Sequence, residues 1–430
     1  MQMLLVHQNF PGQFRELAPA WLEAGHQLTA IGSTPAPDWP GLRYARYSID
    51  SEPPSPLERA RAVDHIGRHL HRNGLRPDVV IGHCGWGEAL PLRQLFPAAR
   101  LIVYPEFWLT PPSLGIGFDP QLQLRPSQLA LHLHDLQRLN LLSELAINQA
   151  NAVIVPNAGQ RASFPEALQP HIQVIPDGVN CAQLRPNPQS QLTLPCGTVV
   201  RAGDPLVTLV SRELEPLRGL RQALQAWPQV MAAEPQARLL LVGGHQDGYG
   251  IEASLASNHL EAALGALPSS VDRNRIHAVG RMEHGQLTAL LQCSACHLGL
   301  SYPYTASWSS LEAMACAVPV ISNPEHPLAA DLRHGDNAWL VPFTDANALA
   351  EAILHLLRHP ERRQQIGAAG RQLIEQHFSL EVALRRYQQL FEQLLLLPPS
   401  AAPATPLATT PTNHHDGAGA TGAARDTRGS

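Results

Sequence analysis

The chain contains no lysine, so all 31 of its basic residues are arginine. This absence excludes chemistry that needs a lysine amine, such as a Schiff base with pyridoxal phosphate. Phosphate binding stays open, because arginine and backbone amides both bind phosphate. The chain also has 36 acidic residues, so its formal net charge is −5, which argues against a general nucleic-acid binder.

Long apolar runs and clustered cysteines are also missing. No stretch approaches the roughly 18 consecutive apolar residues of a membrane-spanning helix. The start, MQMLLVHQNF, lacks the basic region and the long apolar segment of a signal peptide. We therefore expect a cytoplasmic protein. The six cysteines are scattered, and Cys293 and Cys296 have no second pair beside them, so we expect buried thiols rather than a metal or redox site.

Short apolar segments alternate with amphipathic ones, which is typical of parallel sheets covered by helices. At 430 residues, two domains are expected. We predict an α/β protein with two Rossmann-like, doubly wound domains that face a central cleft, where ligands bind at the strand ends. The predicted strands are Met3–His7, Gln27–Ile31, Val79–Gly82, Leu101–Tyr104, Ala152–Pro156, Leu206–Ser211, Arg238–Val242, Arg275–Val279, Ala295–Ser301, Val318–Ser322 and Ala338–Val341. The predicted helices are Phe14–Ala24, Pro56–Asn73, Leu129–Asn151, Leu220–Glu234, Gly285–Gln292, Ser309–Ala315 and Asn347–Leu357.

A stretch rich in Pro and Gln, Gln183–Pro205, separates the two halves. We predict an N-terminal domain over 1–190, a C-terminal domain over 205–379 and a final helix over 380–397. Residues 398–430 are mostly Ala, Pro, Thr and Gly, so a disordered tail is predicted there.

The segment from Ser301 to Ile321, SYPYTASWSSLEAMACAVPVI, carries the most chemical information. A strand leads into a loop of Ser, Thr and aromatic residues, and a short helical run, Leu311–Ala315, follows with Glu312 in its first turn. The unpaired N–H groups at a helix N-terminus attract anions, whereas a nearby carboxylate suits sugar hydroxyls. In a nucleotide site of this kind, backbone amides bind the phosphate and a carboxylate binds the ribose hydroxyls.

From Glu312 to Ile321 the sequence EAMACAVPVI resembles the signature of the family 4 glycosyltransferases, which are retaining nucleotide-sugar transferases of the GT-B fold, group 1 type. That signature has another Glu eight positions earlier, where this chain has Tyr304, and glycines where it has Ser307 and Ala317. The resemblance covers about residues 1–397. It implies a GT-B architecture in which the last helix crosses back onto the N-terminal domain.

The implied activity is hexosyl transfer, with retention, from a UDP- or GDP-sugar to a hydroxyl of a polysaccharide, a lipid-linked glycan or a small molecule. The departing phosphate takes the acceptor proton. Asp331 and Asp336 lack the Asp-x-Asp spacing of a metal site, and arginines and helix dipoles can carry the charge, so we predict no obligatory metal or other cofactor.

Donor-binding residues are implied mainly in the C-terminal half. Arg212 and Arg218 match a family pair six positions apart, and at a strand end they would stabilise the departing diphosphate; a solvated surface pair is the alternative. Glu312 would bind the ribose, Tyr304 would lie near the sugar, and Arg281 would lie near the base. The remaining implied donor contacts are Ala306, Ser307, Trp308, Ser309 and Leu311, although Ser309 or Ser310 could equally be a simple N-cap.

In the N-terminal half, Gly12 and Gln13 follow the first strand, where the family has a glycine-containing loop near the donor phosphates and the acceptor. His83 matches a family histidine that contacts the donor sugar and is implied to be catalytic, as are both arginines. Glu106 ends a strand and would face the cleft in an acceptor-binding or base role. The alternatives are a plain turn for Gly12 and a backbone-bonded histidine for His83.

Two other functions remain open at this stage. A degenerate nucleotide-sugar-binding subunit fits Tyr304 and Ala317, whereas an epimerase would need acid and base residues for which no motif is seen. The Arg- and His-rich segment Leu57–Arg72 would either rest on an anionic membrane surface or form a solvated helix face. No motif specifies the sugar, the base, the acceptor or the oligomeric state.

Overall fold

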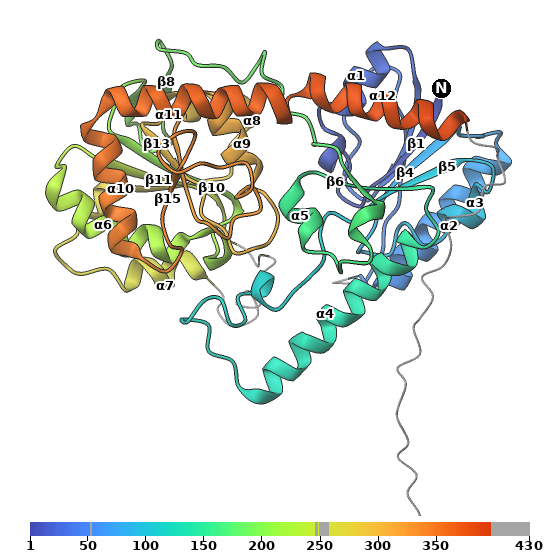
Figure 1. The fold of residues 1–430 in the computed structure, drawn as a ribbon, viewed down its shortest axis with the longest axis horizontal. Helices are drawn as coiled ribbons and strands as arrows, with labels where there is room; N and C mark the ends of the chain where they lie inside the picture. The colour runs from blue at the N-terminus through green and yellow to red at the C-terminus, as the bar shows by residue number, and fades with distance from the viewer. Residues whose placement is uncertain (52–53, 246–247, 249–257, 397–430) are drawn as a thin grey trace, which may run out of the picture.

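The computed structural model describes residues 1–51, 54–245, 248 and 258–396. Two parallel sheets with helices packed around them form two lobes, one from each half of the chain (Figure 1). This arrangement confirms the predicted fold class. The tail predicted over 398–430 lies outside the described residues.

The first sheet has seven strands in the order β3-β2-β1-β4-β5-β6-β7. Its central strands are buried on both faces, which explains why their sequences are almost continuously apolar. The edge strands β3 and β7 escape prediction from sequence, because each is short and only partly buried. The strands are β1 (Gln2–Val6), β2 (Gln27–Gly32), β3 (Arg43–Arg46), β4 (Val79–His83), β5 (Arg100–Tyr104), β6 (Ala152–Val155) and β7 (Ile172–Val174).

The second sheet has six strands in the order β12-β11-β10-β13-β14-β15, and all six are among those predicted. The predicted strand over 295–301 is shorter in the structure, because the chain leaves the sheet early and turns toward the other lobe. The strands are β10 (Leu206–Glu213), β11 (Arg238–Gly244), β12 (Ile276–Gly280), β13 (Cys296–Leu298), β14 (Val320–Ser322) and β15 (Trp339–Leu340).

Helices cover both sheets and supply the rest of the two cores. Helices α3, α5, α7 and α11 have no counterpart among the predicted elements; α3 and α5 are very short, and α11 is strongly polar. The helices are α1 (Leu17–Glu23), α2 (Pro56–Arg72), α3 (Leu92–Leu95), α4 (Pro126–Ile147), α5 (Ala158–Ala162), α6 (Leu220–Ala233), α7 (His259–Gly265), α8 (His284–Cys293), α9 (Trp308–Ala315), α10 (Ala346–Arg358), α11 (Pro360–Leu373) and α12 (Leu380–Leu396).

Helix α12 connects the lobes. It follows α11 along one side of the molecule and ends over the N-terminal sheet (Figure 1). Its apolar side chains join the core beneath β1, and the rings of Trp21 and Tyr387 pack edge to face with centroids 5.2 Å apart. Burying an aromatic side chain contributes roughly 1.5–3 kcal/mol, so this contact ties the C-terminus to the first lobe. The predicted crossover is confirmed.

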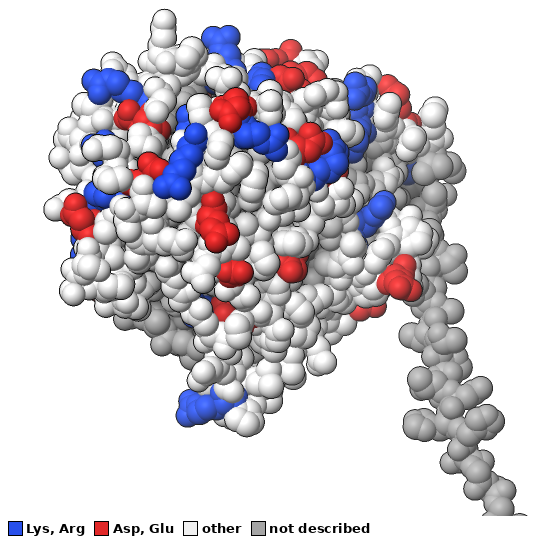
Figure 2. Space-filling model, turned by 60° about the vertical axis from the view of Figure 1, so that its left-hand side comes forward, with Lys and Arg blue, Asp and Glu red and all other residues white. Residues whose placement is uncertain are grey.

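The predicted boundary segment is partly ordered as an antiparallel pair, β8 (Gln191–Thr193) with β9 (Val199–Arg201), which lies next to α8. None of the described helices is long and apolar enough to span a bilayer. On the face shown in Figure 2, acidic and basic side chains are interspersed, without an extended surface of one sign.

Candidate active site

A cleft of about 680 Å³ lies between the lobes, lined by the segments that follow β1, β4 and β5, by α4 and by the end of β10. Its position agrees with the rule that parallel sheets bind ligands at their carboxyl ends. The predicted site residues that line the cleft are Gly12, Gln13, His83, Glu106, Arg212, Arg218, Tyr304 and Trp308. Ala306, Leu311 and Glu312 line a smaller adjoining cavity, together with Gln13, Glu106 and Trp308, and Arg281, Ser307 and Ser309 line neither.

Arg218 is held in a fixed position on the C-terminal wall. It ends a short 3-10 helix (Pro216–Arg218), and Gly219 then turns the chain into α6 with a left-handed φ of 76°. Its guanidinium donates to the Ser301 hydroxyl at 2.9 Å and to the carbonyl and hydroxyl of Thr305 at 2.7 and 3.0 Å. The side chain is therefore oriented before any ligand arrives, whereas Arg212 on the same wall is exposed.

Tyr304 links the two walls. The Arg218 guanidinium lies 5.7 Å from the centre of the Tyr304 ring, and that ring packs edge to face on Phe107 with centroids 4.5 Å apart. Phe107 follows β5 of the other lobe. Position 304 thus contributes a neutral aromatic ring where the two lobes meet.

Glu312 lies in the second turn of α9, not the first, because that helix begins at Trp308 rather than at Leu311. Residue Ser307 is the N-cap, so the N-cap alternative for Ser309 and Ser310 is also wrong. Both serines are buried instead, and the Ser309 hydroxyl donates to the Val210 carbonyl at 2.9 Å. The helix was predicted from the apolar run Leu311–Ala315, which begins about one turn after the start of the helix.

Two partners occupy the buried Glu312 carboxylate. Arg15, from the segment after β1, donates to Oε1 at 2.8 Å, and His284 Nε2 lies 3.2 Å from the same oxygen. Burial raises the pKa of Glu312, but the His284 hydrogen bond and the Arg15 charge outweigh it, so the pKa lies below its usual value. Arg15 also lies 4.9 Å from the centre of the Trp308 ring. The predicted ribose anchor thus forms a bridge between the lobes.

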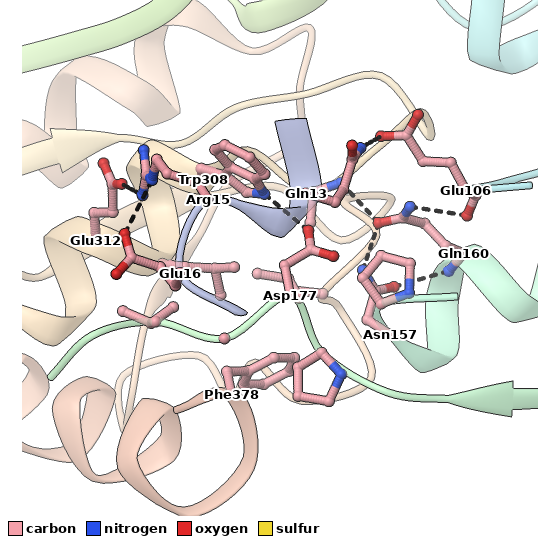
Figure 3. Close-up of a pocket in the computed structure, with 17 residues that line it drawn as sticks. Gln13, Arg15, Glu16, Glu106, Asn157, Gln160, Asp177, Trp308, Glu312 and Phe378 are labelled. Carbon is pink, nitrogen blue, oxygen red and sulfur yellow. Dashed lines mark hydrogen bonds and ion pairs between the residues drawn. The ribbon is translucent and has the colours of Figure 1, made fainter. Parts of the chain in front are cut away.

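The adjoining cavity holds only about 40 Å³, which is enough for ordered water but not for a ribose. Figure 3 shows Asp177 pointing into it from the segment that joins the lobes. Asp177 accepts hydrogen bonds from Tyr104 at 2.8 Å and from the Trp308 indole at 2.9 Å. Burial raises the pKa of this carboxyl to about 6, although both hydrogen bonds act in the opposite direction.

The amide of Ala306, which was predicted to face the ligand, donates to Gln160 at 3.0 Å. Arg281 follows β12 and forms an ion pair with the buried Glu213. Both predicted donor contacts thus have partners within the protein.

The N-terminal wall contains a directed chain of hydrogen bonds. The backbone N–H of Asn9 donates to His7 Nδ1 at 3.0 Å, so His7 carries its proton on Nε2. That Nε2 lies 2.6 Å from the side-chain oxygen Oε1 of Gln13. The Gln13 amide then donates to Glu106 Oε1 at 3.2 Å (Figure 3). Burial and the nearby His83 lower the pKa of His7 well below its usual value, so this imidazole is neutral.

His83 ends β4 and is buried beside this chain. Its Nε2 lies 3.5 Å from Glu106 Oε2, and its ring centre lies 4.6 Å from that of His7. Gly12 has φ 46°, and a Cβ there would come within 2.5 Å of the His7 ring, so a side chain would displace the chain that orients Glu106. His83, Gln13 and Glu106, predicted separately, are brought together.

Sequence reasoning missed His7, Arg15 and Asp177. His7 lies one residue beyond β1, a position that often faces a ligand, so the sequence held a signal for it. Arg15 and Asp177 lie outside any recognised motif, and their partners are far away in the sequence, as the separation of 297 residues between Arg15 and Glu312 shows.

Among the described residues, no group of three or more His, Cys, Asp or Glu side chains could hold a metal ion. All six cysteines are free thiols, and Cys293 and Cys296 are buried as expected. Burial raises the pKa of both thiols, which makes them poor nucleophiles.

Two family models match the chain. The model described as glycosyl transferase family 4 group matches residues 24–184, and the model described as glycosyl transferases group 1 matches residues 199–373. The two matches fall on the two lobes, and neither includes the segment that carries Gly12, Gln13 and Arg15.

Curated relatives are similar over part or most of the chain. A GDP-mannose-dependent monoacylated phosphatidylinositol monomannoside mannosyltransferase of Corynebacterium glutamicum is 27% identical over 52% of this chain and 56% of its own length. A GDP-mannose-dependent phosphatidylinositol monomannoside mannosyltransferase of Mycolicibacterium smegmatis is 25% identical over 86% of this chain and 92% of its own. The first match thus spans little more than half of the relative.

Solved structures share the fold. Sucrose-phosphate synthase from Thermosynechococcus elongatus has a TM-score of 0.70 and 20% identity, with 92% of this chain and 99% of that chain covered. Anabaena HepE in complex with UDP-glucose has a TM-score of 0.67 and 15% identity, with 91% and 100% covered. At these identities the likeness concerns the arrangement of the two lobes.

Proposed function

Because the chain belongs to the family 4, group 1 glycosyltransferases of GT-B fold, we propose that it transfers a sugar from a nucleotide-diphosphate sugar to a hydroxyl group, with retention of configuration. The C-terminal lobe holds the donor and the N-terminal lobe presents the acceptor. No metal or other cofactor is required.

The position of Arg218 is the observation that carries this proposal. A guanidinium that three hydrogen bonds hold to its own lobe needs no reorientation when charge develops in front of it. Arg212 adds a second cation on the same wall. Two arginines suit the two phosphates of a leaving nucleotide and replace the charge that a metal ion would supply.

The reaction balances without an enzymic base. The bond between the anomeric carbon and the phosphate oxygen breaks, and a bond to the acceptor oxygen forms on the same face of the sugar. The acceptor proton passes to the departing phosphate oxygen. His83 and Glu106 lie on the opposite wall, where they would contact the sugar.

The donor is a GDP- or UDP-sugar, and the acceptor is a glycan or a lipid-linked glycan. Support comes from relatives that are named for GDP-mannose and for phosphatidylinositol mannosides, and from a fold neighbour solved with UDP-glucose. Ribose binding at Glu312 requires Arg15 to release that carboxylate, because the cavity that both side chains line is too small for a sugar ring.

A lipid-linked acceptor would bring the protein to the inner face of the membrane. Helix α2 exposes Leu57, Arg61 and Arg72 to solvent, a combination that suits an anionic surface. Co-sedimentation with vesicles that contain anionic lipid tests this contact; recovery only in the supernatant would contradict it.

The transferase proposal is tested by incubating the protein with UDP-, GDP- and ADP-sugars, with and without EDTA, in the presence of glycan and glycolipid acceptors. We expect release of one nucleotide, unaffected by EDTA, and a product whose anomeric proton coupling shows the donor's configuration. An inverted product would contradict retention. Tight nucleotide binding without turnover, across all donors and acceptors, would favour the degenerate binding subunit.

A further inference from the structure

Two acidic side chains line the described part of the cleft, Glu106 and Asp135, and their settings differ. Asp135 lies on α4, with 46% of its side chain exposed, and pairs with Arg138 at 3.4 Å. Glu106 follows β5, near the middle of the N-terminal sheet, and 28% of its side chain is exposed. Of the two carboxylates, Glu106 is the one enclosed between the walls.

The backbone at Glu106 is strained. Its φ of 64° is left-handed, which among the described non-glycine residues occurs only here and at Ala317. Such a conformation costs about 1–2 kcal/mol for a residue with a side chain. The Glu106 carbonyl accepts a hydrogen bond from Gln160 at 3.0 Å, which helps to hold this conformation. Strain at a cleft residue, stabilised by its surroundings, points to a function.

Neighbouring side chains orient the carboxylate of Glu106. The hydrogen-bond chain from Asn9 through His7 ends with an amide N–H of Gln13 donating to Glu106 Oε1. Because the His7 proton lies on Nε2, the Gln13 carbonyl faces His7 and its NH₂ faces Glu106. This donor fixes the direction of Oε1, so the carboxylate lines the cleft in a set orientation.

Glu106 and Arg218 act on the same space from opposite walls. Phe107, the next residue, packs on Tyr304, and Tyr304 lies against Arg218. Burial lowers the pKa of Arg218, and the negative charges of Glu215 and Glu106 act in the opposite direction. The phenol of Tyr304 cannot supply a carboxylate's charge from the C-terminal wall.

We propose that Glu106 is a catalytic residue whose carboxylate faces the anomeric carbon of the donor sugar and stabilises the positive charge that develops as the diphosphate departs toward Arg218. This inference rests on the proposed function. Glu106 forms no bond and keeps its charge throughout, while the acceptor proton still passes to the phosphate oxygen. The negative charge thus comes from the acceptor-side lobe.

The test is Glu106→Gln, which keeps the size of the side chain and its capacity to hydrogen-bond but removes the charge. We expect kcat to fall by roughly 10²–10³-fold, the usual cost of removing one electrostatic stabiliser, with the donor KM within about threefold. The matched control is Glu166→Gln, which removes the same charge from an exposed residue of the same lobe and should keep the wild-type kcat. Nucleoside diphosphate affinity, measured on each variant, reports whether the donor site is still folded.

A double variant separates charge from structure. Because position 304 faces the same space, Tyr304→Glu in the Glu106→Gln background should restore kcat at least tenfold, which a purely structural role of Glu106 would not produce. If the wild type is active, a kcat of Glu106→Gln within threefold of the wild-type kcat would overturn this inference but not the proposed function. A double variant whose kcat is no higher than that of Glu106→Gln would do the same. A wild type without transfer from any donor would overturn the proposed function as well.

Discussion

Replacing Asp177 with Asn should stabilise the protein at neutral and alkaline pH. The carboxyl receives the Tyr104 hydroxyl on one oxygen and the Trp308 indole on the other, but burial still raises its pKa to about 6. An Asn side chain can keep both contacts, since its oxygen accepts from Trp308 and its NH₂ donates to the Tyr104 oxygen. The substitution therefore removes a buried charge and keeps the clamp between the lobes.

The magnitude follows from the pKa difference. The folded pKa of about 6 lies above the ordinary value of 3.8, so the stability linked to this group is fully present below pH 3.8 and is lost as the pH rises through 6. At one pKa unit per 1.36 kcal/mol, the charged Asp177 costs about 3 kcal/mol above pH 7. The advantage of Asp177→Asn should grow from about 0.5 kcal/mol at pH 4 to about 3 kcal/mol at pH 8.

Urea unfolding of both proteins, followed by tryptophan fluorescence and by circular dichroism at pH 4, 5, 6 and 8, measures this difference. Subtracting the two free energies of unfolding at each pH cancels the titration of all other groups. A difference that stays constant between pH 4 and pH 8, or a variant less stable at pH 8, would refute the reasoning.

Two further substitutions test the contacts around the cleft. Arg15→Gln should tighten binding of the nucleotide about two- to tenfold, because the ribose no longer has to displace an ion pair from Glu312, and isothermal titration measures it; weaker binding would show that Arg15 itself contacts the donor. Gly219→Ala should lower the free energy of unfolding by at least about 2 kcal/mol, because φ is 76° and the new Cβ would lie 2.7 Å from the Leu300 Cβ. Gly265→Ala, where a Cβ meets nothing within 4 Å, is the matched control, and equal effects in urea unfolding would contradict the argument.

The fold was largely predictable because its central strands are buried on both faces. Val79–Gly82 and Leu101–Tyr104 are continuous apolar segments in the sequence, and burial by helices on each side requires such segments. The edge strand Arg43–Arg46 carries no such requirement and reads as a loop. Helix ends were less predictable. Helix α9 begins at Trp308, and the two serines that follow are buried; Ser309 bonds to β10 and β13 and does not cap the helix.

Strand ends indicated Glu106 and Arg212, and the family resemblance indicated Arg218 and His83; all four line the cleft. Contacts with the other lobe could not be predicted in this way. The bond from Arg15 to Glu312 depends on how the lobes close, which no local pattern encodes. The left-handed backbone at Glu106 is equally hidden, because a glutamate does not favour that conformation and the surrounding contacts impose it.

The central claim, that Arg218 holds the diphosphate of a nucleotide sugar in this cleft, is tested most directly by isothermal titration of UDP and GDP into wild type and Arg218→Ala, with EDTA present. We expect wild type to bind one of the two nucleotides without metal. Arg218→Ala should bind it at least about 100-fold more weakly, because a charged hydrogen-bonding partner of a phosphate is lost. Equal affinity in the two proteins, or binding only when a divalent metal is added, would contradict it.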